Sequence, residues 1–315
     1  MLQLSVLRND PAFVKERLAV KHCKQLDLVD SIIALDDQRK KLQLDFDTTQ
    51  AKVNAASKEI GKMMASGNAA GAEAIKQEVA GWKESLDPIK TQMAEIETSL
   101  TNQLLQLPNL PGAPVPVGKT PEDNVVVKTG GPTTTLSAGA VPHWDLAKKY
   151  NLIDFDLGNK ITGSGFPVYI GKGAKLQRAL IQYFLDFNTA AGYTEYLPPF
   201  MVNEASALGT GQLPDKEGQM YYMPADDFYM IPTAEVPVTN VYRDVIVKPE
   251  EFPIKMTAYS PCFRREAGSY GKDVRGLNRL HQFEKVEIIQ IVEPSTSYTV
   301  LDEMVAHVEK LVASL

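Results

Sequence analysis

The sequence contains few cysteines and histidines, no long apolar run and no excess of positive charge. Its 2 cysteines and 4 histidines are scattered without the spacing of metal ligands, so we expect no protein-held metal site. Arg8 and Asp10 stand where a secretory signal would need an apolar stretch. No stretch approaches the roughly 18 apolar residues of a membrane-spanning helix, so we expect a soluble, cytoplasmic protein without a membrane partner.

The bulk composition allows a sizeable core and two domains. Hydrophobic residues make up 44% of the 315 residues and charged residues 23%, values that are ordinary for a globular protein. The formal net charge of −6 repels phosphate on average, so a nucleic-acid partner needs a local basic surface. This balance argues against a DNA-binding protein and leaves room for a shaped RNA-binding element.

Two heptad patterns occupy the first third of the chain. Apolar residues recur at alternating steps of four and three from Leu28 to Met63, with Arg39 as one of two interruptions, and again from Ile75 to Leu107. A turn signal, Ser-Gly-Asn, stands at 66–68. The pattern predicts two long helices that pack on each other as an antiparallel coiled coil. Such a thin hairpin cannot enclose a catalytic pocket, so we expect a spacer, a dimer element or a reaching arm.

The patterns divide the chain into three segments. Residues 1–107 are predicted to form the helical arm, with the coiled coil from about residue 26, and Pro88 is expected to kink its second helix. Residues 108–140 are rich in proline and glycine and read as a linker and connector. Residues 141–315 mix helical and strand patterns, which indicates an α+β domain.

Within the second domain the spacing of apolar residues predicts individual elements. An amphipathic helix is expected from Lys175 to Ala191, followed by a strand at 193–197. Two further strands are expected at 257–267 and 281–292, before a helix that runs from about residue 297 to the end.

The strongest functional pattern is the segment 260–290, which reads SPCFRREAGSYGKDVRGLNRLHQFEKVEIIQ. Two strand-like runs flank a glycine-rich loop that carries Lys272, Arg275 and Arg279. Alternation along a strand puts Arg264 and Glu266 on one face, and likewise Phe283, Lys285 and Glu287. Phe283 and Glu287 then stand about 13 Å apart, which suits a ligand with a flat base at one end and a small charged group at the other. Alone, FRRE also fits a surface hairpin with cross-strand ion pairs.

The whole string resembles motif 2 of the class II aminoacyl-tRNA synthetases, and RGLNRLHQFEKVE resembles the seryl-tRNA synthetases in particular. TAEVPVTN at 233–240 and GTGQLP at 209–214 match the same family, and GYTEYLPPFMV at 192–202 resembles its motif 1. The long helical hairpin is also typical of it. The resemblance implies an α+β fold in which a coiled-coil arm accompanies a class II catalytic domain built on an antiparallel sheet.

By this resemblance the protein is expected to be a serine–tRNA ligase, which forms seryl-adenylate from L-serine and ATP and passes the seryl group to tRNA(Ser). The first step is an attack on the α-phosphorus, so the protein must position groups and neutralise charge. Arg264 and Glu266 would be the catalytic residues, Arg264 on the α-phosphate and Glu266 on the adenine amino group. Phe283 would stack on the base, Arg265 and Arg275 would complete the ATP site, and Arg275 has the tRNA end as an alternative target. Mg²⁺ is expected with ATP.

The same resemblance implies a serine pocket lined by Thr233, Ala234, Glu235 and Glu287. A site that hydrogen-bonds a hydroxyl group rejects alanine strongly, because its buried polar groups would be left unpaired. On residue type alone, Glu235 also fits an ordinary exposed acid.

The family's coiled coil is thought to lie along the long extra stem of its tRNA and to contact the backbone rather than the bases. Candidate phosphate contacts on the arm are Lys40, Lys41, Lys52, Lys58, Lys62, Lys76, Lys83 and Lys90. Most of them fit a solvated coiled-coil flank equally well. A homodimer is expected too, because motif 1 forms the class II dimer interface.

The chain ends at Leu315, inside a predicted helix and before the region in which the family carries motif 3. We therefore expect a truncated form that lacks the C-terminal part of its catalytic domain and is inactive or weakly active. Two other readings stay open: a non-catalytic synthetase-like protein used for binding or assembly, and a ligase that charges a carrier protein. The second has little use for the arm.

Overall fold

The computed structural model describes residues 2–131, 134–266 and 275–315. Its chain divides into two compact units, Met1–Thr129 and Gly130–Leu315. No helix in these described ranges is long and apolar enough to cross a membrane.

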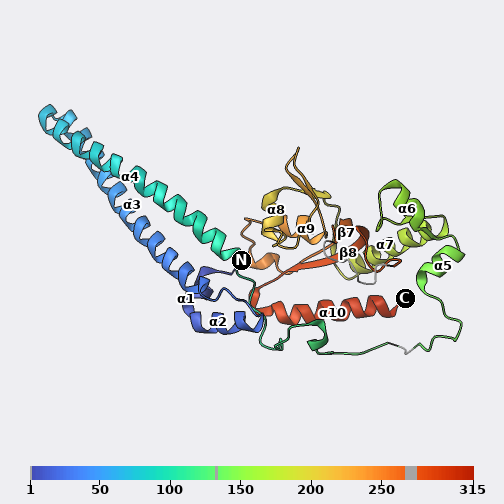
Figure 1. Ribbon diagram of the computed structural model, residues 1–315. Helices are drawn as coiled ribbons and strands as arrows, with labels where there is room; N and C mark the ends of the chain where they lie inside the picture. Colours follow the sequence, from blue (N-terminus) through green and yellow to red (C-terminus); the bar gives the residue numbers. More distant parts are fainter. Residues whose placement is uncertain (1, 132–133, 267–274) are drawn as a thin grey trace. The chain divides into compact units, whose positions relative to one another are not determined.

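Unit 1 is built on a long antiparallel helical hairpin (Figure 1). After the short helices α1 (Leu4–Asn9) and α2 (Pro11–Val20), helix α3 (Leu28–Ala65) runs outward and α4 (Ala69–Leu104) returns, continuing through Pro88. Gly67 takes a φ of +80° at the turn, a conformation that glycine adopts without steric cost. Both predicted helices and the turn between them are confirmed. A short 3₁₀ turn at Pro121–Asp123 is the last element of this unit.

Heptad residues, together with residues of the N-terminal helices, form the two cores of this unit. In the outer half of the hairpin, Val53 and Ala56 of α3 pack against Val79 and Leu86 of α4. At its base a larger cluster joins α1 and α2 to both long helices; its buried members are Leu7, Val14, Leu18, Val29, Ile32, Leu100, Leu104 and Leu107. The hairpin is thus closed by apolar contacts along its seam and is capped at the base by the N-terminal helices.

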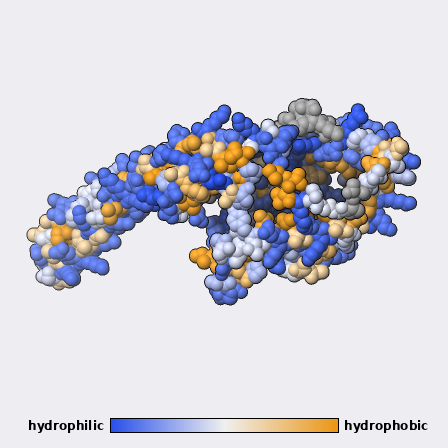
Figure 2. All heavy atoms as spheres, turned by 90° about the horizontal axis from the view of Figure 1, so that it is seen from below, coloured by the Kyte–Doolittle hydropathy of each residue, from blue (hydrophilic) through white to orange (hydrophobic). Residues whose placement is uncertain are grey.

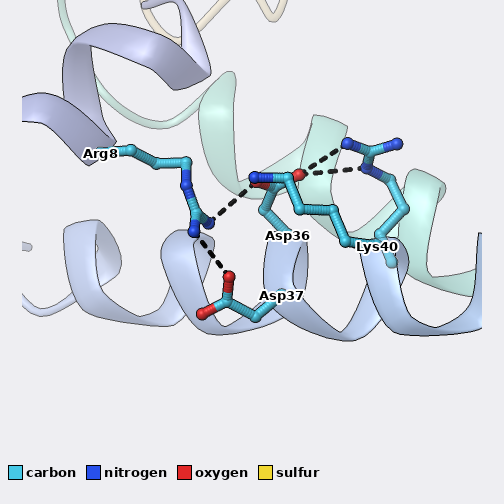
Figure 3. A network of polar contacts seen from close by, with 5 residues as sticks. Arg8, Asp36, Asp37 and Lys40 are labelled. Atoms are coloured by element: carbon cyan, nitrogen blue, oxygen red, sulfur yellow. Dashed lines mark hydrogen bonds and ion pairs between the residues drawn. The ribbon is translucent and has the colours of Figure 1, made fainter. Parts of the chain in front are cut away.

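A polar network ties helix α1 to α3 beside the basal cluster (Figure 3). The carboxylate of Asp36, 1% exposed, accepts from Arg8 at 2.9 Å, from Arg39 at 2.8 Å and from Lys40 at 3.0 Å. Burial by itself would raise the pKa of Asp36, but the hydrogen bonds and positive charges of Arg39 and Lys40 outweigh it and hold the pKa below its usual value. Arg39, which interrupts the heptad pattern, is therefore a partner of Asp36.

Before its two long strands, unit 2 contains helices and short strands, of which β3 belongs to the main sheet. They are α5 (His143–Lys149), β1 (Ile153–Asp154), α6 (Phe155–Ile161), β2 (Val168–Tyr169), α7 (Lys172–Ala190), β3 (Thr194–Tyr196), β4 (Met201–Val202), α8 (Glu204–Gly209), β5 (Tyr222–Met223), β6 (Phe228–Met230) and α9 (Glu235–Asn240). The chain then forms the long strands β7 (Ile254–Phe263) and β8 (Gln282–Ile291) and ends in α10 (Ser297–Ala313), with 3₁₀ turns at Pro249–Glu251 and Pro294–Thr296.

Strands β7 and β8 form the predicted antiparallel hairpin, paired from Ile254↔Ile291 to Phe263↔Gln282. Strand β3 pairs with β7 in parallel, with Thr194 opposite Met256. One detail of the prediction is wrong: strand β7 ends at Phe263 rather than at residue 267, and Glu266 takes a φ of +49°. Strand alternation therefore does not place Arg264 and Glu266 on one face.

Different helices cover the two faces of this sheet. On one face Ala234 and Val238 pack against Met256 and Ala258. On the other, Asn188 of α7 donates to Thr257 of β7 at 3.0 Å. Beyond α7, His307 of α10 lies 2.8 Å from the Asn188 side-chain oxygen.

Helix α10 also has a second, exposed apolar side, which carries Leu301, Val305, Val308 and Val312. Apolar residues gather in patches on an otherwise largely hydrophilic surface in the view of Figure 2.

Candidate functional site

One backbone hydrogen bond joins the two limbs of the hairpin beyond the last residue of β7. The Arg264 N–H donates to the His281 carbonyl at 2.9 Å. This contact holds the Arg264 guanidinium over the Phe283 ring, 5.1 Å from its centroid, a geometry in which a cation is attracted to the ring face. The structure therefore brings together the arginine and the aromatic residue that the sequence assigned to one ligand.

Glu266 reaches the same place by another route. After the positive φ at this residue, its carboxylate accepts from Arg279 of the returning limb at 3.0 Å. The Glu266 side chain is only 13% exposed, whereas that of Arg279 is 45% exposed. The ion pair bridges the two limbs of the hairpin and leaves the arginine accessible to a ligand.

A hollow of about 290 Å³ opens at this end of the hairpin. Its lining is Gln212, Glu217, Gln219, Pro232, Thr233, Arg264, Glu266 and Arg279. Thr233, Arg264 and Glu266 were predicted site residues. Gln212, Glu217, Gln219 and Arg279 were not, although GTGQLP already pointed to the segment around Gln212 and the basic loop to Arg279.

A carboxylate-centred turn positions the segment that carries Glu217 and Gln219. Asp215 accepts from the Gln219 N–H at 2.9 Å and from the Met220 N–H at 2.8 Å. Burial would raise the pKa of Asp215, but these backbone donors prevail and lower it. Gln219 in turn accepts from the Arg265 N–H at 2.9 Å. The turn is therefore tied directly to the end of the hairpin.

A second cluster adjoins the hollow at Thr233. The hydroxyl of Thr233, which is buried, donates to Glu287 Oε2. The same oxygen accepts from the Glu235 N–H at 3.2 Å, and Glu287 Oε1 lies 3.2 Å from Lys285 Nζ. Both oxygens of this carboxylate, whose side chain is 20% exposed, are engaged by donors. Such a carboxylate can receive an ammonium or a hydroxyl group from a ligand.

The remaining predicted residues lie in different surroundings. Ala234 is fully buried and packs in the core, so it can contribute to a site only through its backbone. Glu235, Arg265 and Arg275 are exposed residues. Lys272 of the basic loop lies outside the described residues.

All eight candidate lysines of the arm are exposed. Three of them form ion pairs within their own helix, Lys40 with Asp36 at 3.0 Å, Lys76 with Glu73 at 3.0 Å and Lys90 with Asp87 at 3.7 Å. Such exposed pairs are weak and are exchanged easily for another anion.

Two family models match the chain. Residues 1–111 match the seryl-tRNA synthetase N-terminal domain, and residues 222–315 match the class II tRNA synthetase core domain of the G, H, P, S and T type.

Curated relatives are similar along the chain. The serine–tRNA ligase of Salinibacter ruber is 47% identical over 315 residues, which cover 100% of this chain and 74% of that relative. That of a Cyanothece species is 44% identical over 300 residues, covering 94% of this chain and 70% of the relative.

Solved structures show the same likeness. Seryl-tRNA synthetase from Pyrococcus horikoshii, solved in complex with ATP, superposes with a TM-score of 0.86 at 27% identity over 99% of this chain and 74% of that one. The cytoplasmic serine–tRNA ligase of Naegleria fowleri, in complex with AMP, shares the fold with a TM-score of 0.82 at 23% identity.

Proposed function

Because this chain belongs to the seryl-tRNA synthetase family, we propose that its site is built to activate L-serine with ATP and to pass the seryl group to tRNA(Ser). The observation that carries the proposal is the meeting of Arg264, Glu266 and Thr233 around one hollow, beside the carboxylate of Glu287. Cationic groups, a flat ring and half-buried acids are thus available to one extended ligand.

In the proposed ATP complex, adenine stacks on Phe283 and its amino group donates to Glu266. Arg264, which lies over Phe283, then turns its planar guanidinium to the α-phosphate. Arg279 lines the same hollow and contributes positive charge. The exposed residues Arg265 and Arg275 contribute further positive charge from the surface.

The chemistry requires no protein nucleophile. A carboxylate oxygen of serine attacks the α-phosphorus in line, and pyrophosphate leaves with the electron pair of the broken P–O bond. Arg264 stabilises the charge that builds on the phosphate oxygens. Mg²⁺ would enter with the ATP phosphates, since the described residues contain no group of three acidic, histidine or cysteine side chains that could hold a metal alone.

The proposed serine site centres on Glu287. The serine ammonium takes the place that Lys285 Nζ holds at Glu287 Oε1, and Thr233 and Glu235 border the same pocket. Since Thr233 and the Glu235 N–H already hold Glu287 Oε2, the carboxylate is fixed before the ligand arrives. A preset acceptor costs little reorganisation when serine binds.

The proposal extends to the rest of the chain. Residues 1–107 would serve as the tRNA-binding arm, residues 108–140 as linker and connector, and residues 141–315 as the catalytic part. The exposed lysines of the arm would meet tRNA phosphates. Strand β3, which lies in the segment that resembles motif 1, and the preceding helix α7 would form the interface of a homodimer in the cytoplasm.

Serine-dependent exchange between ATP and pyrophosphate tests the proposal. Glu287→Ala is expected to raise the serine requirement by at least about tenfold while the ATP requirement changes little, because a charged hydrogen-bond partner is removed from serine alone. The control is Glu284→Ala on the same strand, whose carboxylate is bonded to Tyr259 instead. Equal effects of Glu287→Ala on both substrates would contradict the serine assignment. Binding of tRNA(Ser) by a wild-type chain that shows no exchange would favour the non-catalytic alternative.

A further inference from the structure

The returning limb of the hairpin, residues 275–281, is held by a histidine from a distant part of unit 2. His143, the first residue of α5, accepts the Leu277 N–H at its Nε2 atom, at 2.8 Å. For Nε2 to accept, the ring proton must sit on Nδ1. The two residues are 134 positions apart, so the contact joins two segments that no local pattern connects.

The adjacent glycine shows how closely the imidazole approaches. Gly276 has a φ of +66°, and a Cβ atom at this position would lie 2.1 Å from His143 Nε2. The histidine therefore occupies the space that any larger residue at 276 would fill. The imidazole of His143 therefore contacts both residues of the Gly276–Leu277 peptide bond.

The other end of the limb is held separately. The His281 N–H donates to the Gly165 carbonyl at 2.9 Å, and the His281 ring stacks on Phe166 with 5.3 Å between centroids. Tyr221 adds a contact from its hydroxyl to His281 Nδ1 at 3.0 Å. Arg279 therefore lies between two anchored points, and its guanidinium meets Glu266 in the hollow.

We propose that His143 is a positioning residue, which holds the limb through Leu277 and thereby keeps Arg279 at the hollow for the phosphate groups of ATP. The part that concerns ATP rests on the proposed function. Since His143 is an exposed residue at the start of a short helix, its removal opens no core. The effect of a substitution should therefore be local to the limb.

Limited trypsin digestion of the full chain tests the contact without any ligand. The rate of cleavage between Arg279 and Leu280, followed by mass spectrometry, is expected to rise about fivefold in His143→Ala, the factor that corresponds to one net hydrogen bond. His143→Gln places an amide oxygen at similar reach and is expected to restore a near wild-type rate. The control is His22→Ala in unit 1, where the histidine contacts the Gly118 carbonyl, and it is expected to change nothing at this bond.

Titration with ATP then tests the consequence. His143→Ala is expected to weaken ATP binding severalfold, His143→Gln to bind as the wild type does, and the Kd for serine to stay unchanged in both. A wild-type chain that binds no ATP would count against the proposed function, while the digestion result would still decide whether His143 holds the limb. An unchanged cleavage rate in His143→Ala, or an equal rise in His143→Gln, would overturn the proposal.

Gly276→Ala approaches the same contact from the opposite side. Its new Cβ must displace the His143 ring, so cleavage after Arg279 is expected to rise at least as much as in His143→Ala. In the double variant the two effects should not add, because both break one contact. Full additivity would contradict the role of His143.

Discussion

Replacing Asp36 with alanine removes the acceptor at which the base of the arm is tied together. Its carboxylate receives Arg8 from α1 and Arg39 and Lys40 from its own helix. Without it, three cations remain beside the basal cluster with no buried acid between them. Arg8 keeps its contact with Asp37 at 2.7 Å, so α1 is loosened rather than released.

The size of the effect follows from the burial of the partners. Breaking a fully buried ion pair costs about 3–5 kcal/mol, whereas an exposed pair contributes about 0–1 kcal/mol. Asp36 is 1% exposed, but the side chains of Arg39 and Lys40 are 30% and 52% exposed and can be rehydrated. We therefore expect Asp36→Ala to lower the free energy of unfolding by about 2 kcal/mol.

Urea unfolding measures this loss. Trp82 lies in the arm and Trp144 in unit 2, and the chain has 2 tryptophans, so a Trp144→Phe background makes fluorescence a reporter of the arm. The midpoint should fall without a change in m. The matched control is Asp37→Ala, whose side chain is 58% exposed and whose loss should cost well under 1 kcal/mol. A similar cost for both variants would refute the reasoning.

The same residue predicts a dependence on pH. The pKa of Asp36 is lowered in the folded state, so its stabilising contribution is present above the unfolded pKa of about 3.9 and is lost as the pH falls through the folded value. The difference in stability between the wild type and Asp36→Asn should therefore shrink below about pH 4. A constant difference between pH 7 and pH 2 would contradict the assignment.

Two more predictions concern unit 2. Asp215→Ala should lower stability by about 1–2 kcal/mol, because two backbone donors lose their acceptor. Its lowered pKa means that the loss, measured by urea unfolding, is present at pH 7 and fades below about pH 4. Gly165→Ala should cost about 2 kcal/mol in thermal unfolding, since a positive φ and a crowded Cβ act together; that Cβ would lie 2.5 Å from the His281 ring. Gly163→Ala is the control, because φ is also positive there but nothing lies within 4 Å of the Cβ; an equal cost would show that the contact with His281 does not matter.

The arm could be predicted because its packing is local in sequence. Steps of four and three place Val53 and Ala56 on one stripe of a helix whatever the rest of the chain does, and these residues are indeed buried against α4. The burial of Asp36 was not predictable, because its partner Arg8 is 28 residues away. Arg39 looked like a defect in the heptad because its role depends on the burial of Asp36, its partner three residues earlier.

The candidate site likewise contains residues that the sequence could place and residues that it could not. Phe283 and Glu287 were placed on one face by strand alternation, and β8 covers both positions. Alternation could not place Glu266, because the strand ends before it and a positive φ redirects the chain. Gln219 and Glu217 reach the hollow through the turn at Asp215, which depends on tertiary contacts. The resemblance to a family identified the segment around Gln212 but not the side chains that line the hollow.

The network at Asp36 lies near the base of the long helical arm, so small rotations there produce large displacements at the far end. From Asp36 to the end of α3 at Ala65, the helix extends about 44 Å at 1.5 Å per residue. A swing of about 5° at the foot therefore carries the tip through about 4 Å, which exceeds the length of a hydrogen bond. Small movements of Arg8, Asp36 and Arg39 therefore become larger displacements at Lys58 and Lys62. The rigidity of the network at the base of the arm determines how precisely these lysines are positioned.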